Sequence, residues 1–227
     1  RPTINELWGI EQAVLLGDYL FAKAGDYAAA TGNLRVIRHF SQTLMIISSG
    51  ELAQAYSAFN LELTRKNYLQ RITRKTASLF TMATESGAVL SMAPEESVEI
   101  LRDYGRNLGI AFQIVDDILD FSGTEEELGK PIGSDLAQGT FTLPAMVFLE
   151  RYPEDNPVKR LFDDEDNKEE NIRLAVESIR NSPIIEECFG IASRYSERAC
   201  DKLKFLPNNT VRQSLIDLAD YVITRRK

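Results

Sequence analysis

The chain has 227 residues, of which 44% are hydrophobic and 26% are charged, and its formal net charge is -8. This length and composition predict one folded domain over residues 1–227 with a core large enough to be stable by itself. The negative charge argues against a general affinity for nucleic acid or for an anionic membrane surface.

Two further classes are disfavoured by what the sequence lacks. The single histidine, His39, argues against a zinc site built from histidines and against a Ser-His-Asp triad. No apolar run approaches the roughly 20 residues of a transmembrane helix, and the N-terminal RPTINELWGI has no signal-peptide core. We therefore expect a cytoplasmic protein whose chemistry depends on acids and cations.

Apolar residues at helical spacing dominate the chain, and the alternation typical of strands is scarce. The pattern predicts an all-α protein. In chain order, we expect helices at residues 5–30, 34–48, 52–59, 64–92, 94–121, 136–152, 171–181, 184–205 and 211–225. The span 122–139 contains four glycines and one proline, and a loop of that length inside a compact helical domain is usually functional. The acidic run at 163–166 is expected to be a solvated loop.

The helix predicted at 94–121 ends in an acidic motif. At about 100° per residue, Gln113, Asp116, Asp117 and Asp120 share an arc of only about 100°. The rest of this segment is mostly apolar, and clustered carboxylates in such surroundings are costly unless a cation neutralises them. Oxygen ligands with positions left for water and phosphate are typical of Mg²⁺ sites. The motif therefore predicts a magnesium site, with a solvated helix face as the alternative.

Two lysines are candidates to accompany this metal site, because a metal-bound diphosphate needs further positive charge on its other oxygens. Lys75, followed by Thr76, lies in RITRKTASLF, and Lys130 lies in the glycine-rich loop after the aspartates. Each lysine alone also fits a solvent-facing position. Gly105 and Gly109, one turn apart on the aspartate helix, predict the close approach of another helix.

Four segments carry a resemblance to a known family. FQIVDDILDFSG, GKPIGSDLAQGTFTLP, RKTASLF and the early NELWGIEQAVLLGDYL together resemble the trans-type polyprenyl diphosphate synthases, and the likeness runs to the terminal LADYVITRRK. The resemblance implies an isoprenoid-synthase-type helical bundle with a central cavity, usually assembled as a homodimer. The amino-acid sequence of the glycine-rich loop, GKPIGSDLAQGTFTLP, looks closer to that of medium- or long-chain synthases.

The resemblance also implies a reaction and roles. In that family an aspartate-rich motif, matched here by Asp116, Asp117 and Asp120, binds Mg²⁺ that bridges the diphosphate of an allylic substrate. Lys75, Thr76, Gln113 and Lys130 match residues around the same diphosphate. The implied reaction is ionisation of the allylic prenyl diphosphate, attack by isopentenyl diphosphate on the cation, and loss of a proton. The implied catalytic residues are Asp116, Asp117, Asp120, Lys75 and Lys130.

The chain departs from the family pattern in two places. Thr140 follows Gly139 where many relatives have lysine. The family's first DDxxD motif, the arginines after it and the basic residues for isopentenyl diphosphate lie upstream of the position matched by Arg1. We therefore expect a shortened form or fragment of an enzyme. We also expect negligible prenyl transfer by this chain alone, because half of the metal site is absent and ionisation by one aspartate face loses several kcal/mol of transition-state stabilisation.

Two other functions stay open. One is a non-catalytic partner subunit of a heteromeric prenyl synthase. The other is a class I terpene cyclase, which would need an (N/D)xx(S/T)xxxE helix that is not evident. Leu34, Ile37 and Phe40 are candidates for the wall of a product tunnel, with an ordinary core role as the alternative.

Overall fold

A computed structural model of the chain describes residues 2–56, 58–124, 131–154, 156–163 and 167–225. Within these residues every regular element is a helix, which confirms the predicted all-α class. No helix among them is long and apolar enough to cross a membrane.

The described residues form a series of helices of different lengths. In chain order they are α1 (Ile4–Trp8), α2 (Ile10–Ala30), α3 (Leu34–Tyr56), α4 (Arg65–Ile72), the π-helix η1 (Thr73–Ala77), α5 (Ser78–Leu90), α6 (Glu95–Ser122), α8 (Ser134–Ala137), α9 (Leu143–Arg151), α10 (Pro157–Asp163), α11 (Lys168–Arg180), α12 (Ile184–Asp201), the 3-10 helix η2 (Leu203–Phe205) and α13 (Thr210–Thr224).

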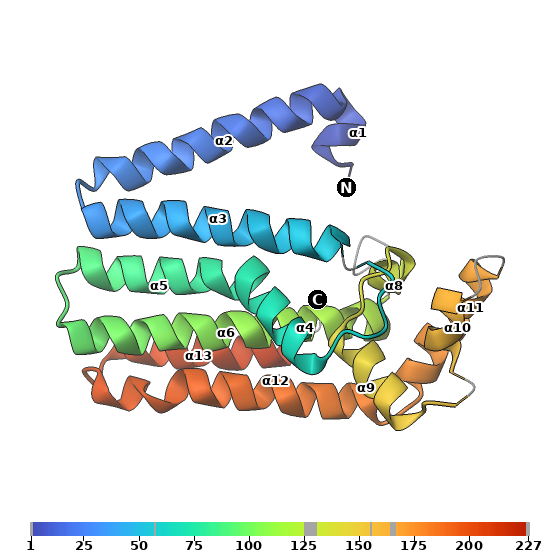
Figure 1. Cartoon of the computed structure of the whole chain (residues 1–227). Coiled ribbons are helices and arrows are strands. Elements are labelled where there is room, and N and C mark those ends of the chain that lie inside the picture. Colours follow the sequence, from blue (N-terminus) through green and yellow to red (C-terminus); the bar gives the residue numbers. More distant parts are fainter. Residues whose placement is uncertain (1, 57, 125–130, 155, 164–166, 226–227) are drawn as a thin grey trace.

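The long helices lie side by side, with α6 in the middle of the bundle (Figure 1). On one side α6 packs against α5, and on the other it packs against α12 and α13. Its apolar stripe is almost wholly buried, from Val98 through Leu108 and Ile114 to Phe121. Burial of this kind is the dominant favourable contribution to folding, so the helix that carries the aspartates is anchored firmly on most of its sides.

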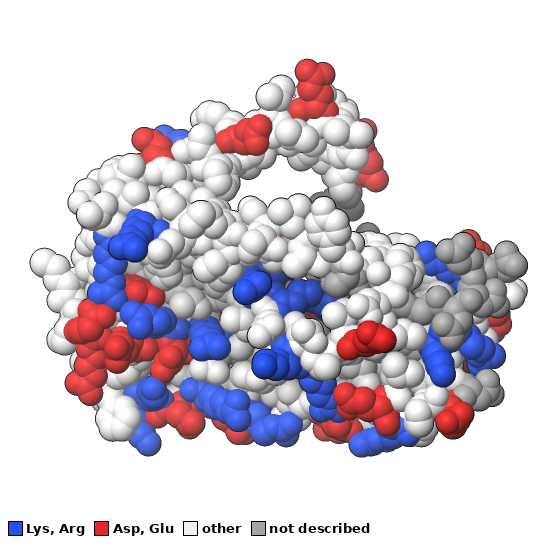
Figure 2. Space-filling view, viewed as in Figure 1, with Lys and Arg blue, Asp and Glu red and all other residues white. Residues whose placement is uncertain are grey.

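Helices α1 and α2 form an arm at one edge of the bundle (Figure 1). Neither helix has a buried residue, and large apolar side chains such as Trp8, Ile10 and Tyr19 are 59%, 74% and 64% exposed. Figure 2 shows an open space between this arm and the body of the molecule. The hydrophobic core is therefore built by α3 to α13.

Glycines shift three of the predicted helix boundaries. The helix expected at 5–30 is broken at Gly9, whose φ of +89° ends α1 and starts α2. The break expected near Gly50 was wrong, because Gly50 lies inside the continuous α3, where a Cβ would be 3.4 Å from the Cβ of Arg74. The helix expected at 136–152 is divided into α8 and α9, since Gly139 has a φ of +74°.

Two more expectations changed. The helix expected at 64–92 contains the π-helix η1, whose residues include Lys75 and Thr76. π-helical turns are rare and often occur at functional sites. Helix α10 replaces part of the connector before the acidic run, and of that run only Asp163 is described, as the last residue of α10.

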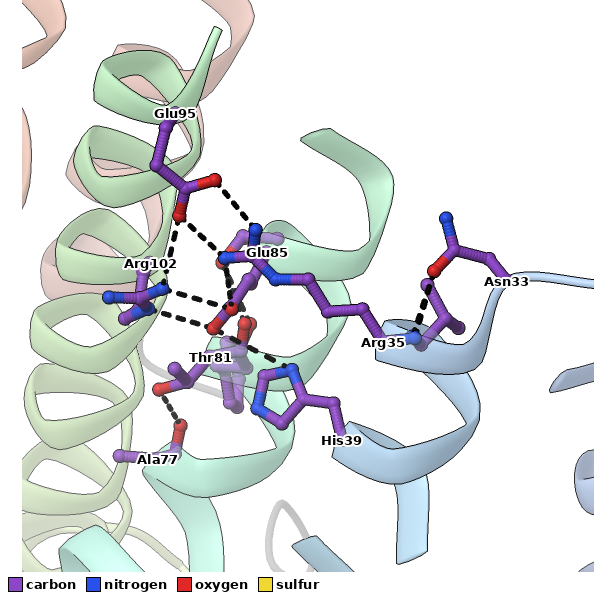
Figure 3. A network of polar contacts seen from close by, with 11 residues as sticks. Asn33, Arg35, His39, Ala77, Thr81, Glu85, Glu95 and Arg102 are labelled. Carbon is purple, nitrogen blue, oxygen red and sulfur yellow. Dashed lines mark hydrogen bonds and ion pairs between the residues drawn. The ribbon is translucent and has the colours of Figure 1, made fainter. Parts of the chain in front are cut away.

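An ion-pair network fastens α3, α5 and α6 at the end of α6 remote from the aspartates (Figure 3). Glu85, with a side chain only 10% exposed, accepts hydrogen bonds from Arg102 at 2.9 Å and from Arg35 at 3.1 Å. Arg35 also binds Glu95 at 2.6 Å, and the Nδ1 atom of His39 lies 3.6 Å from Glu85. The only histidine of the sequence therefore belongs to this network.

Candidate functional site

The three aspartates lie on the last turns of α6, but they differ in burial. Asp117 and Asp120 are 3% and 1% exposed, whereas the side chain of Asp116 is 39% exposed. Each of them has a different set of partners. The arrangement holds two carboxylates rigidly and leaves the third within reach of solvent.

Asp117 is held by two donors. The hydroxyl of Tyr68 on α4 donates to its Oδ2 at 2.7 Å, and the Nε2 of Gln113 donates to its Oδ1 at 2.8 Å. Burial raises the pKa of Asp117 to about 7, although the hydrogen bonds from Gln113 and Tyr68 act in the opposite direction. A buried carboxyl group whose pKa lies near neutral pH is characteristic of functional sites.

Gln113 links the aspartate helix to the π-helix. Its Oε1 accepts a hydrogen bond of 2.6 Å from the hydroxyl of Thr76, while its amide nitrogen holds Asp117. The two helices can approach because Gly109 faces η1: a Cβ there would lie 2.6 Å from the Cα of Ala77. A Cβ on Gly105 would likewise lie 2.6 Å from the backbone oxygen of Phe80 on α5. The close approach of another helix, predicted from these two glycines, is therefore confirmed.

Asp120 is held by the segment that follows α6. The hydroxyl of Ser134 donates to its Oδ1 at 3.0 Å, and the backbone N–H of Asp135 donates to its Oδ2 at 3.2 Å. The N–H of Gly133, a residue with a φ of +72°, donates to the carbonyl of Asp120 at 2.9 Å. Gly133, Ser134 and Asp135 of the glycine-rich segment therefore all contact Asp120. Lys130 lies outside the described residues.

Asp116 forms an ion pair with Arg225, which follows the end of α13. The guanidinium of Arg225 stacks over the ring of Phe112, with 3.8 Å between its Cζ and the ring centroid, and donates to the carbonyl of Phe112 at 2.9 Å. The Arg225 side chain is only 11% exposed, and its Nε is buried with no hydrogen-bond partner. An arginine more than one hundred residues away in sequence thus binds Asp116.

Lys75 points toward α3. Its ammonium forms an ion pair with Glu51 at 3.0 Å and donates to Oε1 of Gln54 at 3.4 Å. The Nε2 of Gln54 in turn donates to the hydroxyl of Thr140 at 3.4 Å. Lys75 is therefore connected through Gln54 to Thr140, which stands where many relatives carry lysine. Within the described residues, Lys75 forms no ion pair with the aspartates.

The carboxylates of Asp116, Asp117 and Asp120 fit one side of a magnesium site. Among the described residues, no three His, Cys, Asp or Glu side chains are gathered closely enough to hold a metal by themselves. Mg²⁺, however, usually takes one or two carboxylates and fills its other positions with water and substrate phosphate. The half-exposed carboxylate of Asp116 suits that role, and Asp117 and Asp120 add negative charge beside it.

Several residues of this site were not predicted from the sequence. Tyr68, Ser134 and Arg225 reach the aspartates from α4, α8 and the end of α13. No local spacing could have found them, because each contact depends on the packing of separate helices. Of the candidates for a tunnel wall, Leu34 is 77% exposed, and the ring of Phe40 lies 6.2 Å from that of Phe21 on α2; their role stays a prediction.

Comparisons with known proteins identify the family of the chain. The Polyprenyl synthetase family profile matches residues 1–179. The chain is 37% identical over 224 residues to a prenyl transferase of Synechocystis sp., covering 99% of this chain and 68% of the relative. It is 35% identical over 226 residues to heptaprenyl diphosphate synthase component 2 of Bacillus subtilis, covering 100% and 64%.

A solved structure matches the whole chain. The heptaprenyl diphosphate synthase of Staphylococcus aureus superposes with a TM-score of 0.95 at 34% identity, covering 100% of this chain and 71% of that one. This likeness confirms the isoprenoid-synthase-type bundle. The chain thus corresponds to about two thirds of the length of these relatives. By its sequence and its fold, the protein belongs to the polyprenyl synthetase family.

Proposed function

We propose that this chain forms one side of the active site of a polyprenyl diphosphate synthase, an enzyme that joins isopentenyl diphosphate to an allylic prenyl diphosphate. The observation that carries the proposal is the hydrogen-bonded series from Thr76 through Gln113 to Asp117. It brings together three of the residues that the family resemblance implies around the diphosphate. Family membership and two relatives named for heptaprenyl diphosphate synthesis support it.

In this proposal the protein positions negative charge for a metal and positive charge for phosphate. A bound Mg²⁺ would neutralise charge that develops on the departing diphosphate. Asp116 offers the accessible carboxylate, while Tyr68 and Gln113 hold Asp117, and Ser134 holds Asp120, before the substrate arrives. Groups that are already oriented need no reorganisation during the reaction, which makes their electrostatic contribution large.

Lys75 is proposed to supply positive charge to phosphate oxygens from the side of α3. Its ammonium is held by Glu51 and Gln54, and the side chain of Gln54 also contacts Thr140. Lys130 is proposed for the same role. The proton lost in the last step is proposed to go to the released diphosphate, because the single histidine lies beside Glu85 and not beside the aspartates.

The product is proposed to be a medium- or long-chain trans-polyprenyl diphosphate. A homodimer is the assembly that we propose first. The Bacillus subtilis relative is named as component 2 of its synthase, so that protein is one part of a larger enzyme. Association of this chain with a different second component is therefore the alternative.

The test begins with translation of the coding sequence upstream of Arg1, followed by expression of the complete reading frame. That protein is incubated with isopentenyl diphosphate, farnesyl diphosphate and Mg²⁺, and the chain length of the products is measured by chromatography. We expect Asp116→Asn and Asp117→Asn to lower kcat by about 100-fold or more. Glu177→Gln, in an exposed ion pair on α11, is the matched control. Equal turnover with and without divalent metal, or an unaffected Asp116→Asn variant, would overturn the proposal.

A further inference from the structure

A hollow lined by charged side chains lies along α6, away from its aspartate end. It has a volume of about 730 Å³ and is bounded by α4, η1, α6 and α12. Its cations are Lys66, Arg74, Arg106 and Arg198, one from each of these elements. Figure 2 shows Lys and Arg side chains around α4, and along α12 they alternate with Asp and Glu side chains.

None of these four cations has a carboxylate partner among the described residues. Elsewhere, arginines that do pair with an acid in the described part of the chain are Arg35, Arg65, Arg102, Arg151, Arg173 and Arg225. The acid that lines the hollow, Asp103, is bound by Lys202 at 2.6 Å. A chain with a net charge of -8 thus keeps an excess of positive charge in one hollow.

The hollow also offers apolar and neutral polar surface. Leu69, Ile110 and the ring of Tyr195 contribute to its lining, and Arg198 stacks on that ring at 5.3 Å. Asn107 and Gln70 add amide groups that can donate hydrogen bonds. A ligand that fits this lining is an anion with several phosphate oxygens, and an attached apolar group would find a matching surface.

We propose that this hollow binds a diphosphate group directly, without a metal ion. Guanidinium groups bind phosphate oxygens through paired hydrogen bonds, and three of the four cations here are arginines. The aspartate site is different, because carboxylates repel phosphate unless a divalent cation lies between them. Arg74 is the immediate neighbour of Lys75 in η1, so a diphosphate on Arg74 would lie next to the turn that presents Lys75 and Thr76.

Two sources could supply the diphosphate group: inorganic diphosphate, and a prenyl diphosphate whose hydrocarbon contacts Leu69 and Ile110. The experiment is isothermal titration calorimetry of the chain with inorganic diphosphate in the presence of EDTA, so that the aspartate site has no metal. We expect saturable binding that weakens as the salt concentration rises, since the contacts are between exposed charges.

Variants assign this binding to the hollow. The double variant Arg74→Gln/Arg106→Gln is expected to weaken it at least tenfold. The matched control is Arg38→Gln/Lys159→Gln, which removes the same charge from exposed residues on α3 and α10. Circular dichroism checks that all variants stay folded. Absence of saturable binding in EDTA, or equal weakening in the control variant, would overturn the proposal.

A second titration identifies the source. If farnesyl diphosphate binds at least tenfold more tightly than inorganic diphosphate in EDTA, and Arg74→Gln/Arg106→Gln weakens both, the ligand is a prenyl diphosphate. Equal affinities identify free diphosphate. This proposal does not rest on the proposed function, and a negative result leaves the metal-dependent aspartate site untested by it.

Discussion

The hydroxyl of Tyr68 donates a hydrogen bond of 2.7 Å to Asp117, and both side chains are buried. The two residues are separated by 49 positions in sequence, so this single bond ties α4 to the aspartate end of α6. Burial works against the charged form of Asp117, and a donor inside the core offsets part of that cost.

Tyr68→Phe should therefore destabilise the protein more than the loss of an ordinary buried hydroxyl. At pH 8.5, above the pKa of Asp117 near 7, we expect the free energy of unfolding to fall by about 2 kcal/mol, because an ionised carboxylate loses a donor. Tyr104→Phe is the matched control, since its hydroxyl donates 2.8 Å to the neutral carbonyl of Leu215, and it should cost about 1 kcal/mol. Urea denaturation measures both, and equal losses would contradict the prediction.

Gly109 and Gly87 give opposite predictions for the same substitution. A Cβ on Gly109 would meet Ala77 at 2.6 Å, whereas nothing lies within 4 Å of a Cβ on Gly87. We expect Gly109→Ala to force α6 and η1 apart and to cost about 1–3 kcal/mol. Gly87→Ala, inside α5, should stabilise the protein by up to about 1 kcal/mol through helix propensity. Thermal unfolding of the two variants checks the prediction, and a stabilised Gly109→Ala variant would disprove the close contact.

The Glu85 network predicts a loss of stability in acid. Burial alone would raise the pKa of Glu85, but hydrogen bonds from Arg102 and Arg35 outweigh it, so its pKa lies below the ordinary 4.5. A carboxylate with a lowered pKa stabilises the fold above its unfolded pKa, and this contribution disappears as the pH falls through the folded value. We expect Glu85→Gln to cost about 2 kcal/mol at pH 7, with the difference from the parent protein shrinking below about pH 4.5.

The measurement for Glu85 is the free energy of unfolding of both proteins from pH 7 to pH 3. Glu177→Gln removes an exposed ion pair with Arg173 and should change stability by less than about 0.5 kcal/mol at any of these pH values. A Glu85→Gln effect that does not depend on pH would mean that side-chain packing, and not charge, accounts for the loss.

The ion pair between Arg225 and Asp116 predicts that Arg225 competes with a metal ion for the Asp116 carboxylate. Its guanidinium is bound to the carboxylate that we propose as the accessible metal ligand, and two cations at one carboxylate repel each other. Arg225→Gln should therefore tighten Mn²⁺ binding by roughly fivefold, equivalent to about 1 kcal/mol. Electron paramagnetic resonance of free Mn²⁺ measures the affinity, with Arg212→Gln on α13 as the control. Weaker metal binding in Arg225→Gln would show that this arginine supports the metal site instead.

Helical periodicity was sufficient to predict the fold class, because apolar stripes such as that of α6 recur over many turns. It failed at single glycines. Gly50 and Gly9 look alike in sequence, but Gly50 permits helix packing inside α3 whereas Gly9 adopts a left-handed φ that ends α1. Which of the two roles a glycine has depends on its neighbours in space.

The site was predictable only where its residues are close in sequence. Gln113 and Asp117 are one turn apart on α6, so their hydrogen bond follows from helix geometry. The family resemblance implied that Thr76 and Gln113 lie around the same diphosphate, but it did not predict the hydrogen bond between them. The partners Tyr68 and Arg225 come from α4 and the end of α13, and their contacts arise from packing that no short-range pattern encodes.

The π-helix η1 holds one residue more than an α-helix would need between α4 and α5. Five residues at the wider π-helical turn rotate the chain by nearly the same angle as four α-helical residues at about 100° each. Removing one residue from Thr73–Ala77 would therefore leave Tyr68 directed at Asp117 and Glu85 at its arginines. The deletion would instead change where Lys75 and Thr76 lie on the turn. A one-residue gap at this place in an alignment would thus mark a protein with a differently built Lys-Thr turn, even where every aspartate is retained.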